Sequence, residues 1–253
     1  MENCLKSPNL PAGKVSLCLL DARAGDSIVE SLKNLGVGII KCQRCDELYD
    51  AVSCHPDMLF HHLGGNDIVA ALNAPKETLE ELKRHKFHII KGRYTVSDKY
   101  PHCAAYNVAR IGDYAICNKK NVDPMLLDCL TSTGVRILDV KQGYCKCSLC
   151  IVNANAIITS DEGIYKSLSK YDFDILKIRP GNIRLSGLNY GFIGGASGLI
   201  DKTTLAFAGK IEDHPDYNSM LEFLSKYDVQ TKDLGNGALT DIGSLIPLKE
   251  MSY

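Results

Sequence analysis

The sequence contains no tryptophan, no excess of either charge and no apolar run that approaches a membrane span. Lys and Arg number 29 and Asp and Glu number 30, which gives a formal net charge of -1. A chain without a basic excess has no overall field that attracts nucleic acid or an anionic membrane. A membrane-spanning helix needs about 20 apolar residues, and the first residues also lack the apolar core of a signal peptide. We therefore expect a cytoplasmic protein that binds neither nucleic acid nor membranes.

Cysteine is the residue that the sequence has in unusual number, with 11 along the chain. The number is odd and no export signal is evident, so we expect reduced thiols rather than a disulfide framework. Cysteines such as Cys18, Cys42 and Cys117 fall in apolar segments, where a thiol packs as a small hydrophobic side chain. With 45% hydrophobic residues, a chain of this length has enough apolar surface for a substantial core.

One order of strands and helices recurs along the chain. In the later copies, two apolar strands are followed by an amphipathic helix and another strand, and the closing strands IIKCQ, IIKGR, ILDVKQ and ILKIRP resemble one another. Such self-similarity indicates one supersecondary unit used several times. We place the units at about 14–44, 55–93, 103–143, 144–181 and 189–235, with a closing strand at 242–248. The prediction is a single α/β domain over residues 1–253, and a generic αβ sandwich is the alternative.

Four short segments carry a family resemblance. They are HPDMLF at 55–60, YNVARIGDYAICN at 106–118, CKCSLCIV at 145–152 and LGNGALTDIGSLIP at 234–247. In order and plan the chain resembles a divergent bacterial branch of the guanidine-modifying, or pentein, superfamily, which includes arginine and agmatine deiminases, dimethylarginine hydrolases, amidinotransferases and a non-enzymatic ribosome anti-association factor. The resemblance implies a five-fold pseudosymmetric α/β propeller of ββαβ units around a central pocket.

The resemblance also shows where this sequence departs from the enzymes. Their early acid falls on His62, and their Glu-Gly-Gly-Asp element falls on Ala104 to Asn107. Their histidine falls on Cys145, and their nucleophile falls on or beside Asp241. A cationic guanidinium would meet imidazole and amide where it needs carboxylates. We therefore do not expect the usual hydrolysis of arginine.

Three residues are the candidates for catalysis: Cys147 as nucleophile, His62 (with His55 as the alternative) for proton transfer, and Asp241 as an orienting acid. Candidate substrate-binding residues are His55, Asp57, Asn66, Tyr106, Asn107, Lys146, Gly194 and Gly195. If Cys145, Cys147 and Cys150 lie on a strand, the first two share a face and the third points the other way. Buried thiols, a reactive thiol and a metal site all remain open for this cluster.

Other motifs give weaker signals. The tripeptide HPD occurs at 55–57 and at 214–216, and each copy is typical of a turn. The run GFIGGASG at 191–198 lacks the Gly-Lys-Ser/Thr ending of a phosphate-binding loop, so small residues for close packing of a strand are the simpler explanation. We predict no metal and no cofactor.

These observations favour a cysteine-dependent hydrolase or transferase that acts on a small amidine-like or amide-like molecule in the central pocket. A non-catalytic binding or sensor protein that uses the same pocket is the first alternative, and a metal protein built on the cysteine cluster is the second. The sequence leaves the formation of a homo-oligomer open.

Overall fold

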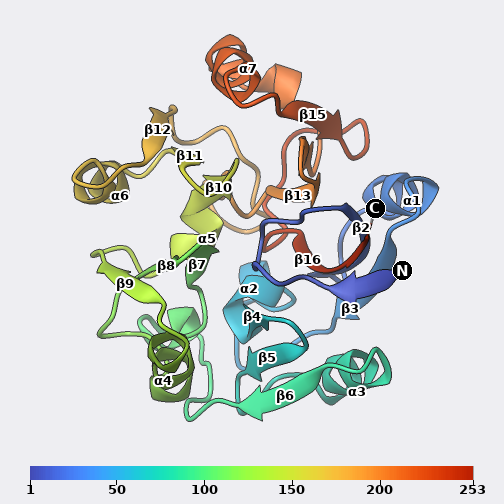
Figure 1. The fold of residues 1–253 in the computed structure, drawn as a ribbon, viewed down its shortest axis with the longest axis vertical. Coiled ribbons are helices and arrows are strands. Elements are labelled where there is room, and N and C mark those ends of the chain that lie inside the picture. Colours follow the sequence, from blue (N-terminus) through green and yellow to red (C-terminus); the bar gives the residue numbers. More distant parts are fainter. Residues whose placement is uncertain (253) are drawn as a thin grey trace.

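The computed structural model describes residues 1–252. Five small mixed sheets stand around a central axis, and the longer helices lie on the outside of the ring (Figure 1). The outer helices are α1 (Asp26–Asn34), α3 (Lys76–Arg84), α4 (Pro124–Ser132), α6 (Glu162–Leu168) and α7 (Tyr217–Ser225). Shorter helical segments are η1 (Asp50–Val52), α2 (Pro56–Leu59), η2 (His102–Ala104), α5 (Cys145–Ser148) and η3 (Ile211–Asp213).

Four of the sheets share one design of an inner, a middle and an outer strand. The inner strand is antiparallel to the middle strand, and the middle strand is parallel to the outer strand. The four triplets are β4 (Phe60–Gly64), β5 (Asp67–Ala70) and β6 (His88–Lys91); β7 (Ala109–Ile111), β8 (Tyr114–Cys117) and β9 (Arg136–Asp139); β10 (Leu149–Ile151), β11 (Ala156–Thr159) and β12 (Asp174–Lys177); β13 (Ser197–Asp201), β14 (Thr204–Phe207) and β15 (Gln230–Asp233).

The first sheet closes the ring with the other end of the chain. It is formed by β1 (Glu2–Cys4), β16 (Ile246–Met251), β2 (Lys14–Asp21) and β3 (Gly38–Cys42), in that order across the sheet. Strand β16 pairs antiparallel with β2 and so supplies the inner strand that unit one lacks in its own sequence. A closing strand was predicted at 242–248, and the observed strand begins at Ile246. The pairing of β1 with β16 was not predicted.

Burial explains why the middle strands read as apolar runs. The four residues of β11 are all buried, whereas the outer strand β12 exposes both of its end residues. A strand that is covered on both faces excludes polar side chains, and a strand at the edge tolerates them.

Helix α4 shows how neighbouring residues determine where a helix begins. Oδ1 of Asp123 accepts hydrogen bonds from the backbone N–H groups of Met125 (2.8 Å) and Leu126 (3.1 Å), and Pro124 occupies the first turn. Oδ2 of the same carboxylate accepts from the backbone of Arg93 and Tyr94 in the preceding unit. Asp123 thus caps helix α4, and its carboxylate also joins two units.

Two inner strands begin later than their apolar residues suggest. The segments MLFHH at 58–62 and CSLCIVN at 147–153 have the composition of strands, but Pro56–Leu59 and Cys145–Ser148 each form one helical turn before β4 and β10. The glycine run before Ser197 is a turn as well, and β13 begins only at Ser197. These turns lie next to the axis, where the chain must bend before it enters an inner strand (Figure 1).

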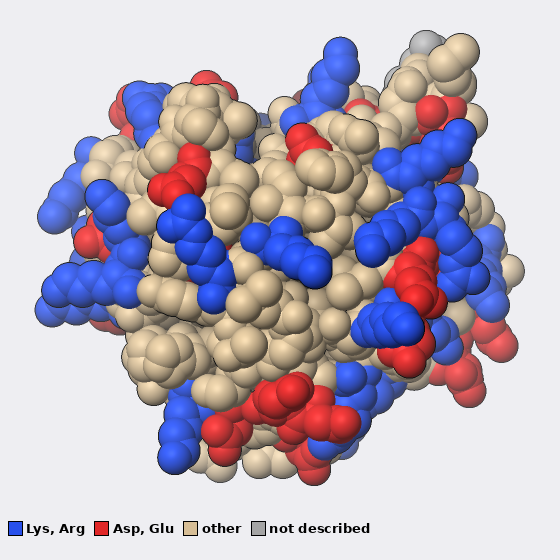
Figure 2. Space-filling model, turned by 90° about the horizontal axis from the view of Figure 1, so that it is seen from below, with Lys and Arg blue, Asp and Glu red and all other residues tan. Residues whose placement is uncertain are grey.

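The surface agrees with the balanced composition. Figure 2 shows Lys and Arg side chains interspersed with Asp and Glu over the face seen from below. Within residues 1–252, no helix combines the length and the apolar character that crossing a membrane requires.

Candidate active site

A cavity of about 270 Å³ is lined by Met58 of α2 and Cys147 of α5, among others, and these two short helices lie next to the axis (Figure 1). His55, Cys147 and Asp241 form its inner end, and each is at most 4% exposed. The remaining lining residues are mostly aromatic or aliphatic: Tyr49, Val52, Met58, Tyr144, Leu185, Leu188, Asn189, Tyr190 and Phe192. Because Leu188 and Tyr190 are exposed, they mark the mouth. The cavity therefore has a polar inner end and an apolar wall.

The short helices α2 and α5 bring a carboxylate and a thiol into contact. Asp57 lies in α2 and Cys147 in α5, far apart in the sequence. The Cys147 thiol donates a hydrogen bond to Oδ2 of Asp57 at 3.1 Å. The hydroxyl of Ser244 donates to the same oxygen at 2.7 Å. Asp57 thus receives two side-chain donors that come from distant parts of the chain.

Asn107 fixes the orientation of the thiol. Its side-chain oxygen accepts from the backbone N–H groups of Lys146 (2.8 Å) and Cys147 (3.2 Å), at the start of α5. Its Nδ2 donates to Sγ of Cys147 at 3.0 Å and to the backbone oxygen of Asp57 at 3.3 Å. An amide N–H that points at sulfur stabilises the thiolate over the thiol. Asn107 is therefore a positioning residue for Cys147.

The pKa of the Cys147 thiol lies well above its ordinary value. Burial is the largest cause, and the negative charges of Asp57 and Asp241 add to it, while the hydrogen bond from Asn107 acts in the opposite direction. The resting site at neutral pH therefore holds a thiol. A cation placed beside the sulfur would lower this pKa, since opposite charge favours the ionised form.

Asp241 accepts hydrogen bonds from a turn and also faces the cavity. Its oxygens accept from the backbone N–H groups of Phe192 (2.9 Å) and Gly243 (3.0 Å), and the residue also lines the cavity. Burial raises the pKa of this carboxyl group. His55 stands between two acids, with Nδ1 3.8 Å from Asp241 and Nε2 3.7 Å from Asp21.

Two glycines allow this packing. A Cβ at Gly195 would overlap the carboxylate of Asp241, and a Cβ at Gly194 would overlap backbone carbonyl oxygens of α5 and its C-cap residue. The N–H of Gly195 donates to the carbonyl oxygen of Cys147 at 2.9 Å. The close approach that the sequence suggested for this run is therefore present, and it holds Asp241 and Cys147 at one end of the cavity.

No curated protein matches this sequence. The model of a family of unknown function, DUF6873, matches residues 19–246. The chain belongs to the DUF6873 family. That match covers all five units, from β2 to the start of β16.

Solved structures show the fold of this DUF6873 protein. The inosamine-phosphate amidinotransferase StrB1 from Streptomyces griseus is 12% identical, with a TM-score of 0.60 and coverage of 98% of this chain and 97% of that one. The amidinotransferase SxtG from Microseira wollei is also 12% identical, with a TM-score of 0.59 and coverage of 91% of each chain. DDAH from Pseudomonas aeruginosa, in complex with citrulline, is 11% identical, with a TM-score of 0.54 and coverage of 87% and 93%. The predicted pentein fold is confirmed.

Of the predicted site residues of the DUF6873 protein, only His55, Cys147 and Asp241 line the cavity, and His62, Asn66 and Tyr106 have other surroundings. Nε2 of His62 is 2.9 Å from the backbone oxygen of Gly65, and its ring packs edge-on against Phe87. Asn66 is exposed in the turn between β4 and β5 and lines a separate hollow. The hydroxyl of Tyr106 donates to the backbone oxygen of Tyr94. Of the two proposed histidines, the structure thus brings His55 and not His62 to Cys147 and Asp241.

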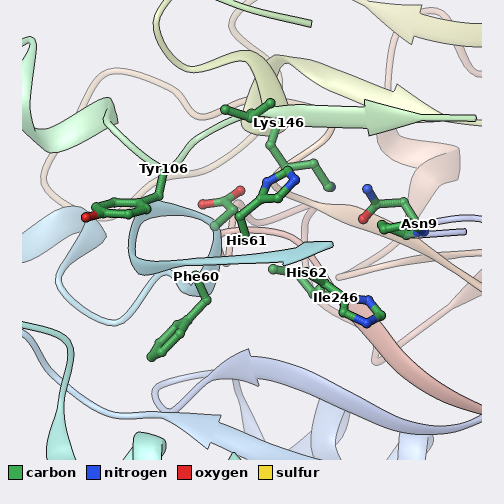
Figure 3. A pocket seen from close by; sticks show the side chains of 10 residues that line it. Asn9, Phe60, His61, His62, Tyr106, Lys146 and Ile246 are labelled. Atoms are coloured by element: carbon green, nitrogen blue, oxygen red, sulfur yellow. The ribbon is translucent and has the colours of Figure 1, made fainter. Parts of the chain in front are cut away.

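Lys146 lies on the other side of α5 from the cavity. It is only 6% exposed, burial lowers its pKa, and within residues 1–252 its ammonium group forms no hydrogen bond or ion pair. Together with His61 and Asp57 it lines a small hollow of about 20 Å³ on the axis. Figure 3 shows His61 on the side of β4 that faces Lys146, and His62 on the opposite side.

The three cysteines of CKCSLC are not grouped. Because α5 is helical, the expected alternation along a strand does not apply. Cys145, Cys147 and Cys150 lie in three different hydrophobic clusters. Among residues 1–252, no group of three or more His, Cys, Asp or Glu side chains has the arrangement of a metal site, and all eleven cysteines there are free thiols.

Two polar residues beside the site were not predicted from the sequence. Asp21 ends strand β2, binds Arg23 and faces His55, and Ser244 reaches Asp57 from the segment before β16. An acid at the last position of an otherwise apolar strand was the available signal for Asp21. No sequence signal pointed to Ser244, because its contact with Asp57 depends on how the ring of units closes.

Two of the buried histidines, His61 and His62, predict a loss of stability in acid. Burial lowers the pKa of His61 to about 3 and that of His62 to about 4. The unfolded chain therefore binds protons that the native state excludes, and the stability is lost as the pH falls from about 6.5 toward these values. Each histidine contributes up to about 1.4 kcal/mol per pH unit.

Urea unfolding of a His62→Gln variant between pH 7 and pH 4.5 measures this effect. We expect a shallower fall in the free energy of unfolding than in the wild type. The same substitution at the exposed His102 is the control and is expected to change the slope less. If the free energy of unfolding of His62→Gln fell with pH as steeply as that of the wild type, the lowered pKa of His62 would be contradicted.

Proposed function

We propose that this DUF6873 protein is a cysteine-dependent hydrolase or transferase that acts on a C–N bond of a small cationic amidine or guanidine. The observation that carries the proposal is the hydrogen bond that the Cys147 thiol donates to Asp57. Cys147 lines the inner end of the cavity together with Asp241, and Asp57 contacts the thiol without lining the cavity itself. Two buried carboxylates and a thiol make a site that favours a planar cation over a neutral or anionic ligand.

The bonds can be followed through both halves of the reaction. Cys147 transfers its proton to Asp57 as the sulfur bonds to the central carbon of the cation. One C–N bond then breaks, and its nitrogen leaves as ammonia or an amine with the proton that Asp57 took from the thiol, passed on directly or through His55. Water next attacks the cationic S-linked carbon and the C–S bond breaks. One proton of that water restores the thiol, and the other passes to the departed amine or to solvent. The product is an amide or a urea, and attack by a second amine in place of water gives a transfer.

The raised pKa of Cys147 makes the reaction depend on its ligand. Without a cation, burial and two carboxylates hold the sulfur protonated. A bound amidinium supplies the opposite charge and favours ionisation, so the thiolate forms where the target carbon is already present. Stray alkylation or oxidation of the resting thiol is disfavoured for the same reason.

A matched pair of alkylating agents tests the proposal. Chloroacetamidine is a cation, and chloroacetamide is its neutral analogue of nearly the same shape. At pH 7.5 we expect the cation to label Cys147 at least about tenfold faster, because an adjacent opposite charge shifts a pKa by one unit or more. Mass mapping identifies the site, and a Cys147→Ser variant should lose it.

Two internal controls are available. Cys18 and Cys117 are buried thiols whose pKa is raised to about 12, and neither lines the cavity. Equal labelling rates for the two reagents at Cys147 would show that the site does not recognise a cation. If Cys18 or Cys117 were labelled as fast as Cys147, the thiol of Cys147 would be no more reactive than other buried thiols of the chain.

Binding without turnover is the second candidate function. The thiol is protonated at rest, and a cavity with a cation-selective inner end and an apolar wall suits a receptor for a small molecule as well as an enzyme. Ligands that raise the melting temperature of the wild type and of Cys147→Ser equally, with no product formed, would favour this function.

A further inference from the structure

We infer that the ligand carries a single cationic head on an apolar body without a carboxylate or a second charge, as in an alkyl or aryl guanidine or amidine. The inference rests on the proposed function for the head group and goes beyond it in defining the rest of the molecule. It follows from the residues between the inner end of the cavity and its mouth.

The charges that line the cavity are the first observation. Among the described residues around it, Asp241 is the only carboxylate and none is Lys or Arg. The basic groups nearby are engaged or turned away: Arg23 is paired with Asp21, and Lys146 lines the hollows on the other side of α5. A carboxylate on the ligand would therefore lose its hydration without gaining a Lys or Arg partner, and it would lie in the same cavity as the carboxylate of Asp241. The same holds for a second ammonium group, because no acid among the described residues lines the wall above Asp241.

The aromatic wall is the second observation. Tyr144 stacks on Phe192 with ring centroids 6.3 Å apart, and Tyr190 meets Phe192 edge-on at 6.3 Å. All three rings line the cavity, and its most exposed apolar side chains are Leu188 (49% exposed) and Tyr190 (44% exposed). Exposed apolar side chains around a pocket mark a surface that a ligand covers. A hydrocarbon chain or a ring would bury this wall.

The size of the cavity limits the body. An apolar cavity of about 150 Å³ holds benzene, so a cavity of about 270 Å³ suits a ligand of roughly ten non-hydrogen atoms. Pentylguanidine and benzylguanidine have this size. Agmatine has nearly the same length as pentylguanidine but ends in an ammonium group, which makes the two a matched pair.

Titration calorimetry on Cys147→Ser protein separates the parts of this inference, because the variant binds without turnover. We expect pentylguanidine to bind at least about tenfold more tightly than agmatine and than 4-guanidinobutanoate. Pentylurea, its neutral analogue, is expected to bind at least as weakly as these two. Binding of agmatine or 4-guanidinobutanoate as tight as that of pentylguanidine would overturn the inference but leave the proposed function standing.

Equal binding of pentylguanidine and pentylurea would instead contradict the cationic head group, and thus the proposed function. Absence of binding by every guanidine would overturn both. A Leu188→Glu variant gives an independent check, since an acid at the mouth would attract the ammonium group of agmatine. The ratio of the affinities of pentylguanidine and agmatine should therefore fall or reverse. Leu72→Glu, at an equally exposed leucine that does not line the cavity, is the control and should leave the ratio unchanged.

Discussion

A Gly194→Ala substitution is expected to destabilise the protein by about 3 kcal/mol, at the upper end of the cost of overpacking. A Cβ at this position would lie 2.6 Å from the carbonyl oxygen of Cys147 and closer still to those of Lys146 and Leu149. All three atoms belong to the backbone, so no side-chain rotation relieves the overlap. The turn before β13 must move away from α5, and the cavity loses its inner wall.

The matched control is Gly237→Ala. This glycine has no neighbouring atom within 4 Å of an added Cβ, and we expect a change within about 0.5 kcal/mol of zero. Urea unfolding at pH 7 compares the two variants with the wild type. If both variants were equally stable, the close approach between the glycine turn and α5 would be absent in solution.

An Asp57→Asn substitution is expected to change thiol labelling and turnover in opposite directions. The carboxylate of Asp57 is a main cause, after burial, of the raised pKa of Cys147, so its removal lowers that pKa. Below the pKa, the thiolate fraction rises tenfold for each unit by which the pKa falls. Alkylation of Cys147 by neutral iodoacetamide should therefore become about tenfold faster at pH 8.

Turnover of a guanidine substrate should fall in the same variant, by about 10²-fold to 10⁴-fold, because the amide that replaces the carboxylate is not a base and cannot accept the proton of the thiol. A purely structural role for Asp57 would slow both reactions or neither. Asp46→Asn, at a surface carboxylate that is 88% exposed, is the control and should alter neither rate. Slower alkylation in Asp57→Asn would refute the proposed contact between carboxylate and thiol.

The fold was predictable because its signals are local. The strands β11 and β14 are continuous apolar runs, Asp123 and Pro124 start a helix, and Gly134 ends it with a positive φ of 77°. These features depend on neighbouring residues and on burial of whole faces, so they can be read along the chain. The repetition of one order of elements then gave the number of units and the strand that closes the ring.

The site could be predicted only in part, and the two HPD tripeptides show why. The first copy starts α2, and its His55 and Asp57 reach the site. In the second copy, His214 accepts a hydrogen bond from the backbone N–H of Asp216, and Asp216 binds Arg179 on the surface. Identical residues thus have different roles, because their partners come from distant parts of the chain.

The sequence by itself determined the five units, the buried strands and the regions where they approach the axis. Only the tertiary structure decided which side chains meet there. A helical turn in place of a strand start at Cys145–Ser148 changes the direction of each of its side chains. Ring closure then brings Ser244 and Asp241 to Asp57 and His55. The raised pKa of the Cys147 thiol follows from its burial and from the negative charges of Asp57 and Asp241. Neither cause can be read from a single stretch of the sequence.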